Sequence, residues 1–436
     1  YGLVGSEMCI RDRLNVLFIS PSSQVPIYTH GSTVPIQVDA SLATSMDLYV
    51  GSELVASSGG EAITYSHTAA SYGKTWIKAI ATDGEESVAD SVYFFVMGDV
   101  PVSPLPEGVL PGINYHPIMD EVTLVLHDPP ALKEYAFAVG CFSNWELDED
   151  YLMRRTPDGS HHWITLWLLG VEREIIYQYW IDGNLRLADP YAHKVVDPWH
   201  DKWISSTTYP NLIPYPEGKT TGIASVLQVN WPEYEWSATS YAPPPKEELV
   251  IYELHIRDFT DDDYIISVLD KLDYLETLGV NAIELMPINE FEGNDSWGYN
   301  PSFYFATDKA YGTRNDYKRF IDECHKRGIA VIIDMVLNHS YGQSPFVQMY
   351  FDASAGQWGQ PTADNPWYNE TCPHEPWCWG YDFDHESQYT QTLIDRIAEY
   401  WLTEFRVDGF RLDFTKGLTN NQTGNQGSNY DAARVE

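Results

Sequence analysis

The sequence has few basic residues for its length. Its 436 residues include 26 lysines and arginines against 63 aspartates and glutamates, which gives a formal net charge of -37 at pH 7. A surface this acidic repels phosphate backbones and anionic lipid headgroups, so the composition argues against nucleic-acid binding and membrane-surface binding. A neutral substrate is compatible with this charge, and so is a charge that serves only solubility.

Long apolar runs are also lacking. No stretch reaches the length of a transmembrane helix, and no charged leader followed by an apolar run is recognisable near the N-terminus. The run from Met8 to Arg13 resembles the translation of a sequencing adaptor. We therefore expect residues 1–13 to be a scar that replaces the natural N-terminus, and we exclude them from the fold prediction.

Cysteine is scarce, with five residues in the chain. Cys9 falls in the excluded segment, while Cys141 and Cys324 lie in apolar or helical contexts that predict buried thiols. Cys372 and Cys378 flank a short loop, and we expect a disulfide between them if the protein is exported. A zinc site is less well supported, because a second ligand pair at suitable spacing is missing.

Hydrophobic residues, at 44% of the chain, are sufficient for several cores, and aromatics are abundant at 14%. Between residues 14 and 100, short alternating apolar segments are separated by Gly, Ser, Asp and Asn, a pattern typical of an immunoglobulin-like β-sandwich. The strands expected there are 14–19, 34–38, 48–50, 74–80 and 91–96. The next residues, 101–111, carry four prolines and predict a linker.

A second β-rich block spans about 112–230. It contains a Gly-x-Phe-x-Asn-Trp element ending at Trp145, a Tyr-x-Tyr-x-x-Asp-Gly element ending at Gly183, and an Asp-Pro-Tyr turn ending at Tyr191. These elements resemble carbohydrate-binding module family 48, which implies a β-sandwich that precedes a catalytic domain. Such modules often dock on the catalytic domain instead of holding sugar, so we expect Trp145 and Trp180 to pack inside the sandwich.

From residue 247 to 436 the pattern changes to apolar strands that alternate with amphipathic helices. Apolar strands alternating with helices predict a parallel sheet with helices on its faces. The expected strands are 249–256, 281–288, 330–337 and 405–413, and the expected helices are 264–278, 315–327 and 387–404.

Polar residues follow these strands where each one ends. The third strand leads through Asp334 to Asn338 and His339, and the fourth contains Arg411 and Asp413. Because residues two apart on a strand point the same way, Arg411 and Asp413 share a face. A guanidinium beside a carboxylate favours the ionised form, and an ionised carboxylate suits attack on an anomeric carbon.

Taken together and in this order, these clusters resemble glycoside hydrolase family 13, the α-amylase family. The first family signature, Asp-x-Val-x-Asn-His, is met from Asp334 to His339, and the second, Gly-Phe-Arg-x-Asp, is met from Gly409 to Asp413. The first and second strands also fit, and the resemblance covers about 112–436. It implies an α-glucan as the partner of the protein.

The resemblance also implies a role for each residue. Asp413 would be the nucleophile that forms a glycosyl-enzyme intermediate with retention of configuration, and Arg411 would orient it. His339 would hydrogen-bond the sugar at the cleavage subsite, Tyr299 would stack beneath that sugar, and neighbouring Trp297 is a further candidate for substrate binding.

Two residues of the first signature have open interpretations. Asp334 is a candidate for the substrate-binding site as a residue that holds Arg411 and the strand ends together, and a purely structural role is equally open. Asn338 is a candidate calcium ligand, although a hydrogen bond that supports the site explains it as well. We expect no cofactor to be required.

A (β/α)₈ TIM barrel needs eight strands, and four are recognisable. The predicted fold is therefore multidomain, with two N-terminal β-sandwich domains followed by an incomplete TIM barrel. The family places its general acid glutamate on the fifth strand and a stabilising aspartate on the seventh, and no residue fills either place; Glu436 follows no apolar run. We expect a chain truncated after the fourth strand and inactive by itself.

The function expected from these residues is a retaining glycosidase acting on α-linked glucans such as starch or glycogen, located outside the cell or in the cell envelope. The nearest alternative is an α-glucan branching or debranching enzyme. A glucan-binding homologue without catalysis is a second alternative, against which Arg411, Asp413 and His339 argue. A zinc-binding or adhesive sandwich protein has little support.

Overall fold

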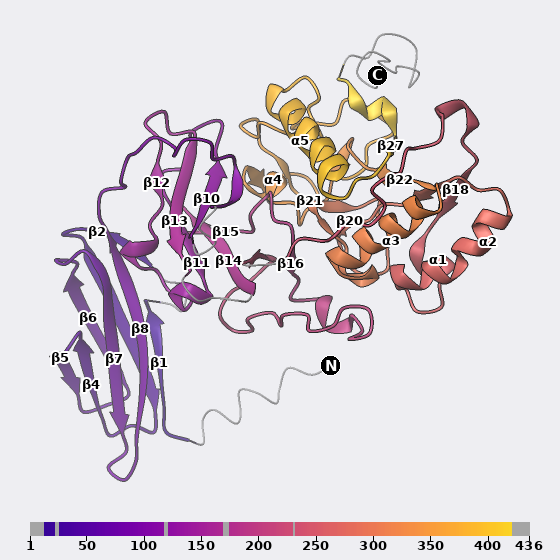
Figure 1. Cartoon of the computed structure of the whole chain (residues 1–436). Helices are drawn as coiled ribbons and strands as arrows, with labels where there is room; N and C mark the ends of the chain where they lie inside the picture. The colour runs from indigo at the N-terminus through magenta and orange to yellow at the C-terminus, as the bar shows by residue number, and fades with distance from the viewer. Residues whose placement is uncertain (1–12, 22–25, 117–120, 169–173, 230–231, 421–436) are drawn as a thin grey trace. The chain divides into compact units, whose positions relative to one another are not determined.

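The computed structural model describes residues 13–21, 26–116, 121–168, 174–229 and 232–420 (Figure 1). The proposed scar up to residue 12, with Cys9, and the terminal Glu436 lie outside these residues. The chain divides into two compact units, which are described separately. The first contains residues up to 102 together with 146–154 and 182–184, and the second contains the remainder.

The first unit is built from two β-sheets. The strands of the three-stranded sheet are, in spatial order, β1 (Asn15–Ser20), β3 (Thr33–Ser41) and β6 (Ala62–Thr68). The five-stranded sheet consists of β2 (Ile27–Thr29), β8 (Ser87–Met97), β7 (Gly73–Thr82), β4 (Ser45–Val50) and β5 (Glu53–Ser58). Alternate residues such as Val34, Ile36 and Val38 of β3 are buried in the core, as the period of two requires.

Three strands of this unit were not expected from the sequence, namely β2, β5 and β6. Strand β2 has three residues, and β5 is mostly half-exposed or exposed along its length. In β6, Ile63 is the one fully buried residue. Because these strands bury little apolar surface, their sequences carry only a weak alternating signal.

The second β-rich block forms two further sheets in the second unit. One has the order β12 (Arg154–Arg155), β13 (His161–Trp167), β10 (Glu121–His127) and β9 (Gly112–Tyr115). The other has the order β11 (Ala136–Gly140), β14 (Glu174–Ile181), β17 (Ala224–Gln228) and β16 (Val195–Val196), with β15 (Leu185–Leu187) beside β14.

The aromatic residues singled out in this block are buried. Trp145 and Trp180 are almost fully inaccessible to solvent, which confirms their predicted packing role. Cys141 contradicts the prediction, because its side chain is exposed. It begins a 3₁₀ turn, Cys141–Ser143, directly after β11, all of whose residues are buried, so it lies just outside the buried strand. Cys324 is buried, as predicted.

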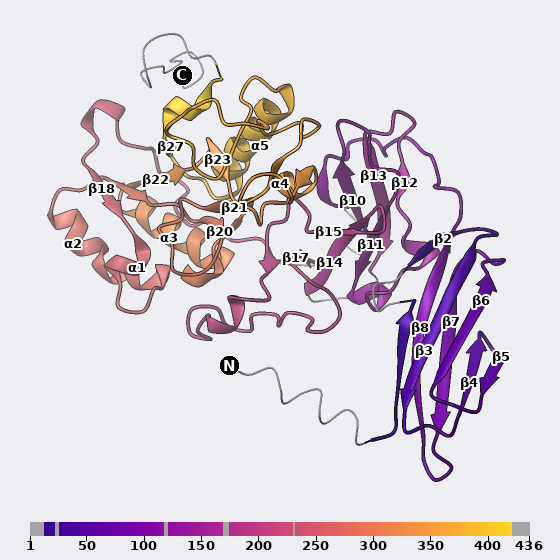
Figure 2. The same ribbon diagram turned by 180° about the vertical axis from the view of Figure 1, so that it is seen from behind.

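A four-stranded parallel sheet forms the remainder of the second unit. Its strands lie in chain order: β18 (Ile251–Leu254), β19 (Ala282–Leu285), β22 (Ala330–Met335) and β27 (Gly409–Leu412). Figure 2 shows these strands and the helices between them from the side opposite to Figure 1. The four strands are the predicted ones, and within the described residues the sheet does not close into a barrel.

The helices between the strands begin at recognisable signals. α3 (Arg314–Lys326) starts with a capping box between Thr313 and Asp316, and α5 (Gln388–Glu404) starts with Ser387, which accepts from the Tyr389 amide. The expected helix 264–278 is partly wrong, since its first half, Ile265–Lys271, is 3₁₀ and only α2 (Leu272–Thr277) is α-helical. No side-chain cap supports either half, and the turn ends at Gly279 with a φ of 82°.

Loops after the strands carry short additional elements. These are α1 (Ile256–Phe259) after β18, the hairpin β20 (Asn289–Phe291) and β21 (Pro301–Thr307) after β19, and, between β22 and α5, β23 (His339–Ser340), α4 (Pro345–Gln348), β24 (Phe351–Asp352), β25 (Gln360–Pro361) and β26 (Tyr381–Asp382). Among the described residues, no helix is both long and apolar enough to cross a bilayer.

The β-rich block and the loops of the parallel sheet share a core. Tyr191 packs against Phe305 of β21 with ring centroids 5.4 Å apart, and the guanidinium of Arg396 on α5 lies 4.3 Å from the Tyr191 ring centre. The Tyr350 hydroxyl donates to the buried Asp128 carboxylate. The block thus makes aromatic and charged contacts with the segments that lead to the site.

Candidate functional site

A pocket of about 370 Å³ lies beyond the carboxyl ends of β22 and β27. Ligands of parallel sheets bind at this edge, and the volume is within the range of small-molecule sites, about 300–1,000 Å³. The residues that line it are Tyr299, His339, Tyr341, Trp379, Asp413 and Phe414.

An arginine between two aspartates forms the charged centre of this site. Parallel pairing of β22 with β27 places Asp334 opposite Arg411. Arg411 Nη1 donates to both oxygens of Asp334 at 3.0 Å and to Oδ1 of Asp413 at 2.8 Å. A single guanidinium therefore holds the Asp413 carboxylate in place at the pocket wall.

Burial and charge act in opposite directions on these groups. Burial raises the pKa of Asp334, although the hydrogen bonds from Tyr299 and the charge of Arg411 act against that rise. Burial by itself lowers the pKa of Arg411, but the two carboxylates outweigh it and raise the pKa. Arg411 consequently stays cationic across the working range of an enzyme.

The two aspartates have different relations to the pocket. Asp413 lines it, whereas the side chain of Asp334 is completely buried and does not. Both Asp334 oxygens accept from Arg411, and Oδ2 also accepts from the Tyr299 hydroxyl at 2.6 Å. Asp334 thus holds Arg411, as expected from the sequence, and also contacts Tyr299, while a direct contact of Asp334 with substrate stays a prediction.

His339 and Tyr299 are held to each other at the pocket wall. His339 Nε2 lies 3.0 Å from the backbone carbonyl of Tyr299, and its Nδ1 contacts the Asn338 amide oxygen. Burial lowers the pKa of His339, while the Tyr299 carbonyl and the charge of Asp413 act against that change. An imidazole beside an aromatic ring suits a neutral polar ligand such as a sugar.

Asn338 does not fit the role of a calcium ligand. Its amide nitrogen donates to the Asp413 backbone carbonyl at 2.9 Å, and its amide oxygen, the atom that would bind calcium, faces His339 Nδ1. Calcium takes six to eight oxygen ligands, whereas both ends of this amide are engaged with the protein. Asn338 instead connects the end of β22 to the end of β27.

Trp297 lies in a different hollow from the nucleophile candidate. It is exposed and lines a neighbouring pocket of about 500 Å³ together with Arg257 and Asn300. Tyr299 and Tyr341 line both pockets, so the two hollows adjoin. The structure thus groups Tyr299, His339 and Asp413 and leaves Trp297 one hollow away.

Three lining residues were not recognised in the sequence: Tyr341, Trp379 and Phe414. Phe414 directly follows Asp413 and Tyr341 lies two positions after His339, so both could have been found by extending each motif past its strand. Trp379 comes from a loop 34 positions before Asp413, so no local pattern connects the two. A usable signal was its place beside Cys378 in a loop rich in tryptophan.

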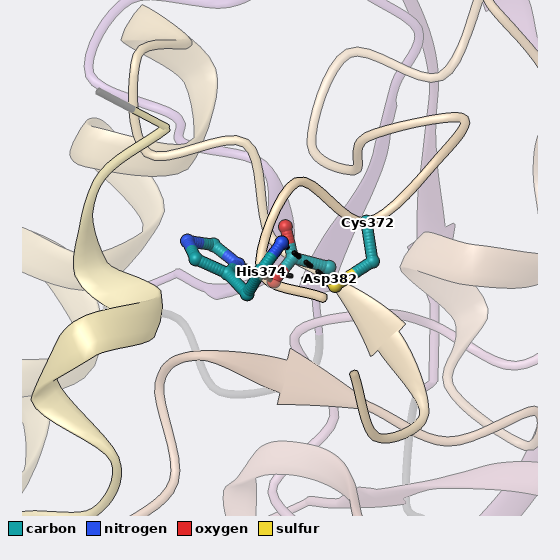
Figure 3. A group of neighbouring side chains, drawn as sticks. All are labelled: Cys372, His374 and Asp382. Carbon is teal, nitrogen blue, oxygen red and sulfur yellow. Dashed lines mark hydrogen bonds and ion pairs between the residues drawn. The ribbon is translucent and has the colours of Figure 1, made fainter. Parts of the chain in front are cut away.

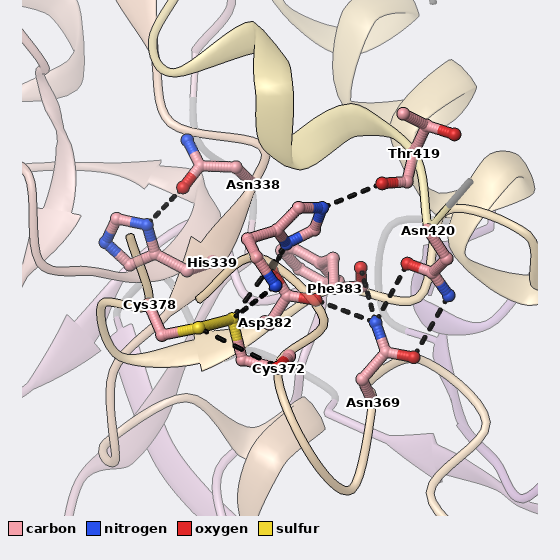
Figure 4. The surroundings of a disulfide bond; sticks show 10 residues. Asn338, His339, Asn369, Cys372, Cys378, Asp382, Phe383, Thr419 and Asn420 are labelled. Atoms are coloured by element: carbon pink, nitrogen blue, oxygen red, sulfur yellow. Dashed lines mark hydrogen bonds and ion pairs between the residues drawn. A yellow bond between two sulfur atoms is a disulfide. The ribbon is translucent and has the colours of Figure 1, made fainter. Parts of the chain in front are cut away.

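Cys372 and Cys378 form the predicted disulfide in this loop. The Cys372 sulfur, His374 and Asp382 lie close enough to resemble a metal site (Figure 3), but a sulfur bonded to another sulfur is not a thiolate ligand. His374 is buried, and both of its ring nitrogens meet acceptors: Asp382 Oδ1 at 2.8 Å and the Thr419 carbonyl at 2.7 Å (Figure 4).

The ionisation of His374 gives a testable dependence on pH. Burial alone lowers its pKa, but Asp382 and the Thr419 carbonyl raise it above 6.5 on balance. A raised histidine pKa stabilises the fold fully below 6.5, and the contribution is lost as pH rises through the folded-state value. We expect His374→Gln to lower the free energy of unfolding by about 2 kcal/mol at pH 6 and by less at pH 9. Urea unfolding at both pH values measures this, and an equal loss at both would contradict it.

Removal of Arg411 should lower the stability of the fold around the site. In Arg411→Met the Asp334 carboxylate stays buried without its cation, a change that costs about 3–5 kcal/mol for fully buried pairs. Because the Arg411 side chain is 41% exposed, we expect a smaller loss of about 2 kcal/mol in the free energy of unfolding. Arg319→Met, at an exposed arginine of α3, is the control and should change it by less than about 0.5 kcal/mol. Equal losses in the two variants would contradict the interpretation.

Part of the chain is similar in sequence to known proteins. Residues 263–390 match the family model of the α-amylase catalytic domain. The chain is 32% identical over 272 residues to malto-oligosyltrehalose trehalohydrolase of Saccharolobus solfataricus, covering 62% of this chain and 41% of that protein. It is 29% identical over 300 residues to a 1,4-alpha-glucan branching enzyme of Oceanobacillus iheyensis, covering 65% of this chain and 41% of the enzyme.

A solved structure shows the same fold over most of the chain. Pullulanase type I from Bacillus subtilis, in complex with maltose, has a TM-score of 0.53 at 19% identity and covers 91% of this chain and 57% of its own. The chain spans about two fifths of the length of the curated relatives named above. Residues 263–390 therefore match the α-amylase catalytic domain, and over 62% of its length the chain is similar to a malto-oligosyltrehalose trehalohydrolase, in agreement with the resemblance of its signatures to glycoside hydrolase family 13.

Proposed function

We propose that the protein cleaves α-linked glucans by a retaining double displacement in which Asp413 is the nucleophile. The observation that carries this proposal is the 2.8 Å bond from Arg411 to Asp413 at the wall of a pocket that also contains Tyr299 and His339. An ionised carboxylate fixed beside a sugar-sized pocket with an aromatic wall is what attack on an anomeric carbon requires.

In the first step an Asp413 oxygen forms a bond to the anomeric carbon as the glycosidic carbon–oxygen bond breaks. The departing oxygen takes a proton from a general acid, and water later releases the sugar with the same configuration. Retaining enzymes place the two carboxyl groups about 5–5.5 Å apart. Asp413 is the one carboxylate among the described residues that line the pocket. We infer that the acid lies outside the described residues and that this chain alone is inactive on natural glucans.

Two activities are compatible with this mechanism, namely hydrolysis of a glucan and transfer of the glycosyl group to a glucan acceptor. The trehalohydrolase relative supports hydrolysis, and the branching-enzyme relative supports transfer to a glucan acceptor. We propose hydrolysis, because trehalohydrolases from three organisms are 32–34% identical to this chain over the matched residues, against 29% for the branching enzyme. Product analysis distinguishes the two: new reducing ends without new α-1,6 branch points support hydrolysis, whereas new branch points support transfer.

We further propose that residues 112–230 form a carbohydrate-binding module of family 48 that supports the catalytic domain. We also propose that the protein works outside the cell or in the cell envelope. The shared core around Tyr191 supports the first proposal. The Cys372–Cys378 disulfide supports the second, because such bonds persist in oxidising compartments. Mass spectrometry of the native protein with and without reductant tests for the bridge.

Covalent trapping tests the proposed nucleophile without a general acid. Fluoride leaves unaided, so 5-fluoro-α-D-glucosyl fluoride can react with Asp413 even where the acid is missing. We expect one fluoroglucosyl group on the peptide that contains β27, detected by peptide mass spectrometry, and none in Asp413→Asn. A label on another carboxylate, or none on a folded protein that binds maltooligosaccharides, would overturn the assignment.

A further inference from the structure

The disulfide-closed loop, residues 372–378, leads directly into the pocket wall through Trp379. Trp379 lines the pocket together with Asp413, and 47% of its surface is exposed. Its ring meets Phe414 edge-on, with centroids 5.1 Å apart. A large aromatic surface that is both fixed and accessible beside the reacting carboxylate is free to stack on a sugar ring.

Strand pairing fixes the backbone on one side of Trp379. His339 of β23 pairs with Asp382 of β26, so the chain that leaves Trp379 runs beside the signature histidine. The intervening Gly380 has a φ of 55°, and a Cβ there would lie 2.4 Å from the Ser340 carbonyl oxygen. This approach requires glycine and holds Trp379 next to His339.

The disulfide-closed loop is fixed on the other side of Trp379 by the disulfide and by His374. The Trp377 amide donates to the His374 carbonyl at 2.8 Å, which closes a turn inside the ring of residues. His374 connects this turn to Asp382 of β26 and to the Thr419 carbonyl, which lies just past Asp413 in the chain. The loop is therefore anchored to both segments that carry the site (Figure 4).

We propose that Trp379 is a sugar-stacking residue of the glucan site and that the disulfide-closed loop pre-orders it there. The inference rests on the proposed function, and it adds a substrate-binding residue that the family signatures do not contain. Pre-ordering matters because a loop that is already fixed loses little entropy when sugar binds. Affinity should therefore depend both on the Trp379 ring and on the closed state of the loop.

Calorimetric titration of the protein with maltotriose and maltoheptaose tests this proposal. We expect Trp379→Ala to raise the dissociation constant about tenfold and Trp379→Phe to restore most of the affinity, because a smaller ring still stacks. Trp167→Ala is the matched control: Trp167 is 67% exposed on β13 and does not line the pocket, so binding should stay unchanged. Melting curves establish that each variant is folded.

A paired cysteine variant tests whether the disulfide contributes to sugar affinity. In the paired variant Cys372→Ser with Cys378→Ser we expect a several-fold loss of affinity, and reductant should weaken binding by the wild type but not by this pair. Unchanged binding by Trp379→Ala, with weakened binding by Tyr299→Ala, would overturn this inference and leave the proposed function intact. A folded wild type that binds neither sugar would overturn both.

Discussion

Asp413→Asn, in a chain that also contains the general acid, is expected to lower the rate of glucan cleavage about 10⁴-fold or more. An amide cannot form the glycosyl ester on which a double displacement depends, so the first chemical step is lost. The fold should remain, since the change weakens one 2.8 Å bond to Arg411, a loss of about 1 kcal/mol in the free energy of unfolding. The initial rate of reducing-end release from starch measures the effect.

Asp395→Asn provides the control for this prediction. Asp395 lies on the exposed face of α5, away from the pocket lining, so the same chemical change there should leave the rate within about twofold. Residual activity of Asp413→Asn at a tenth of the wild-type rate, in freshly purified protein, would show that another group is the nucleophile.

Trp401→Ala is expected to lower the free energy of unfolding of the second unit by about 3–5 kcal/mol. Trp401 on α5 is fully buried, so the substitution leaves a large cavity. Its ring nitrogen also donates to the Tyr304 carbonyl at 2.9 Å, and that buried acceptor would lose one of its two donors and keep Asn289 Nδ2. Tyr304 belongs to β21 beside the site, so the same variant should weaken ligand binding as well. Urea unfolding followed by circular dichroism measures the loss.

Its neighbour on the same helix is the control. Leu402 is 44% exposed, and Leu402→Ala should cost no more than about 0.5 kcal/mol. The two substitutions remove large side chains from adjacent helical residues, and since the range of helix propensities is below about 1 kcal/mol for these residues, a difference of about 3 kcal/mol or more reports burial. Similar losses in both variants would mean that α5 is not packed as described.

The centre of the candidate site followed from spacing along the chain. Arg411 and Asp413 are two residues apart on a strand, so a common side was required, and the parallel sheet then brought Asp334 to Arg411. The disulfide-closed loop was also predicted, because Cys372 and Cys378 are close in sequence. The exposure of Cys141 was not foreseen, because it depends on where β11 stops.

The local sequence also could not predict which distant residues pack against the residues of long loops. Trp379 reaches the pocket through the pairing of β23 with β26 and through the contact of His374 with Thr419, all between segments far apart in the chain. The amide of Asn338 turns toward Asp413 and His339, which removed it as a calcium ligand.

The sequence by itself determined the four strands of the parallel sheet and their order, the acidic character of the surface and the pairing of arginine with aspartate, since each depends on composition or on neighbours within a few residues. Only the tertiary structure decided which aspartate faces the pocket, which aromatic rings line it, and that a disulfide-closed loop supplies one of them. Those outcomes depend on contacts between distant segments, and the periodicity of a single chain carries no record of such contacts.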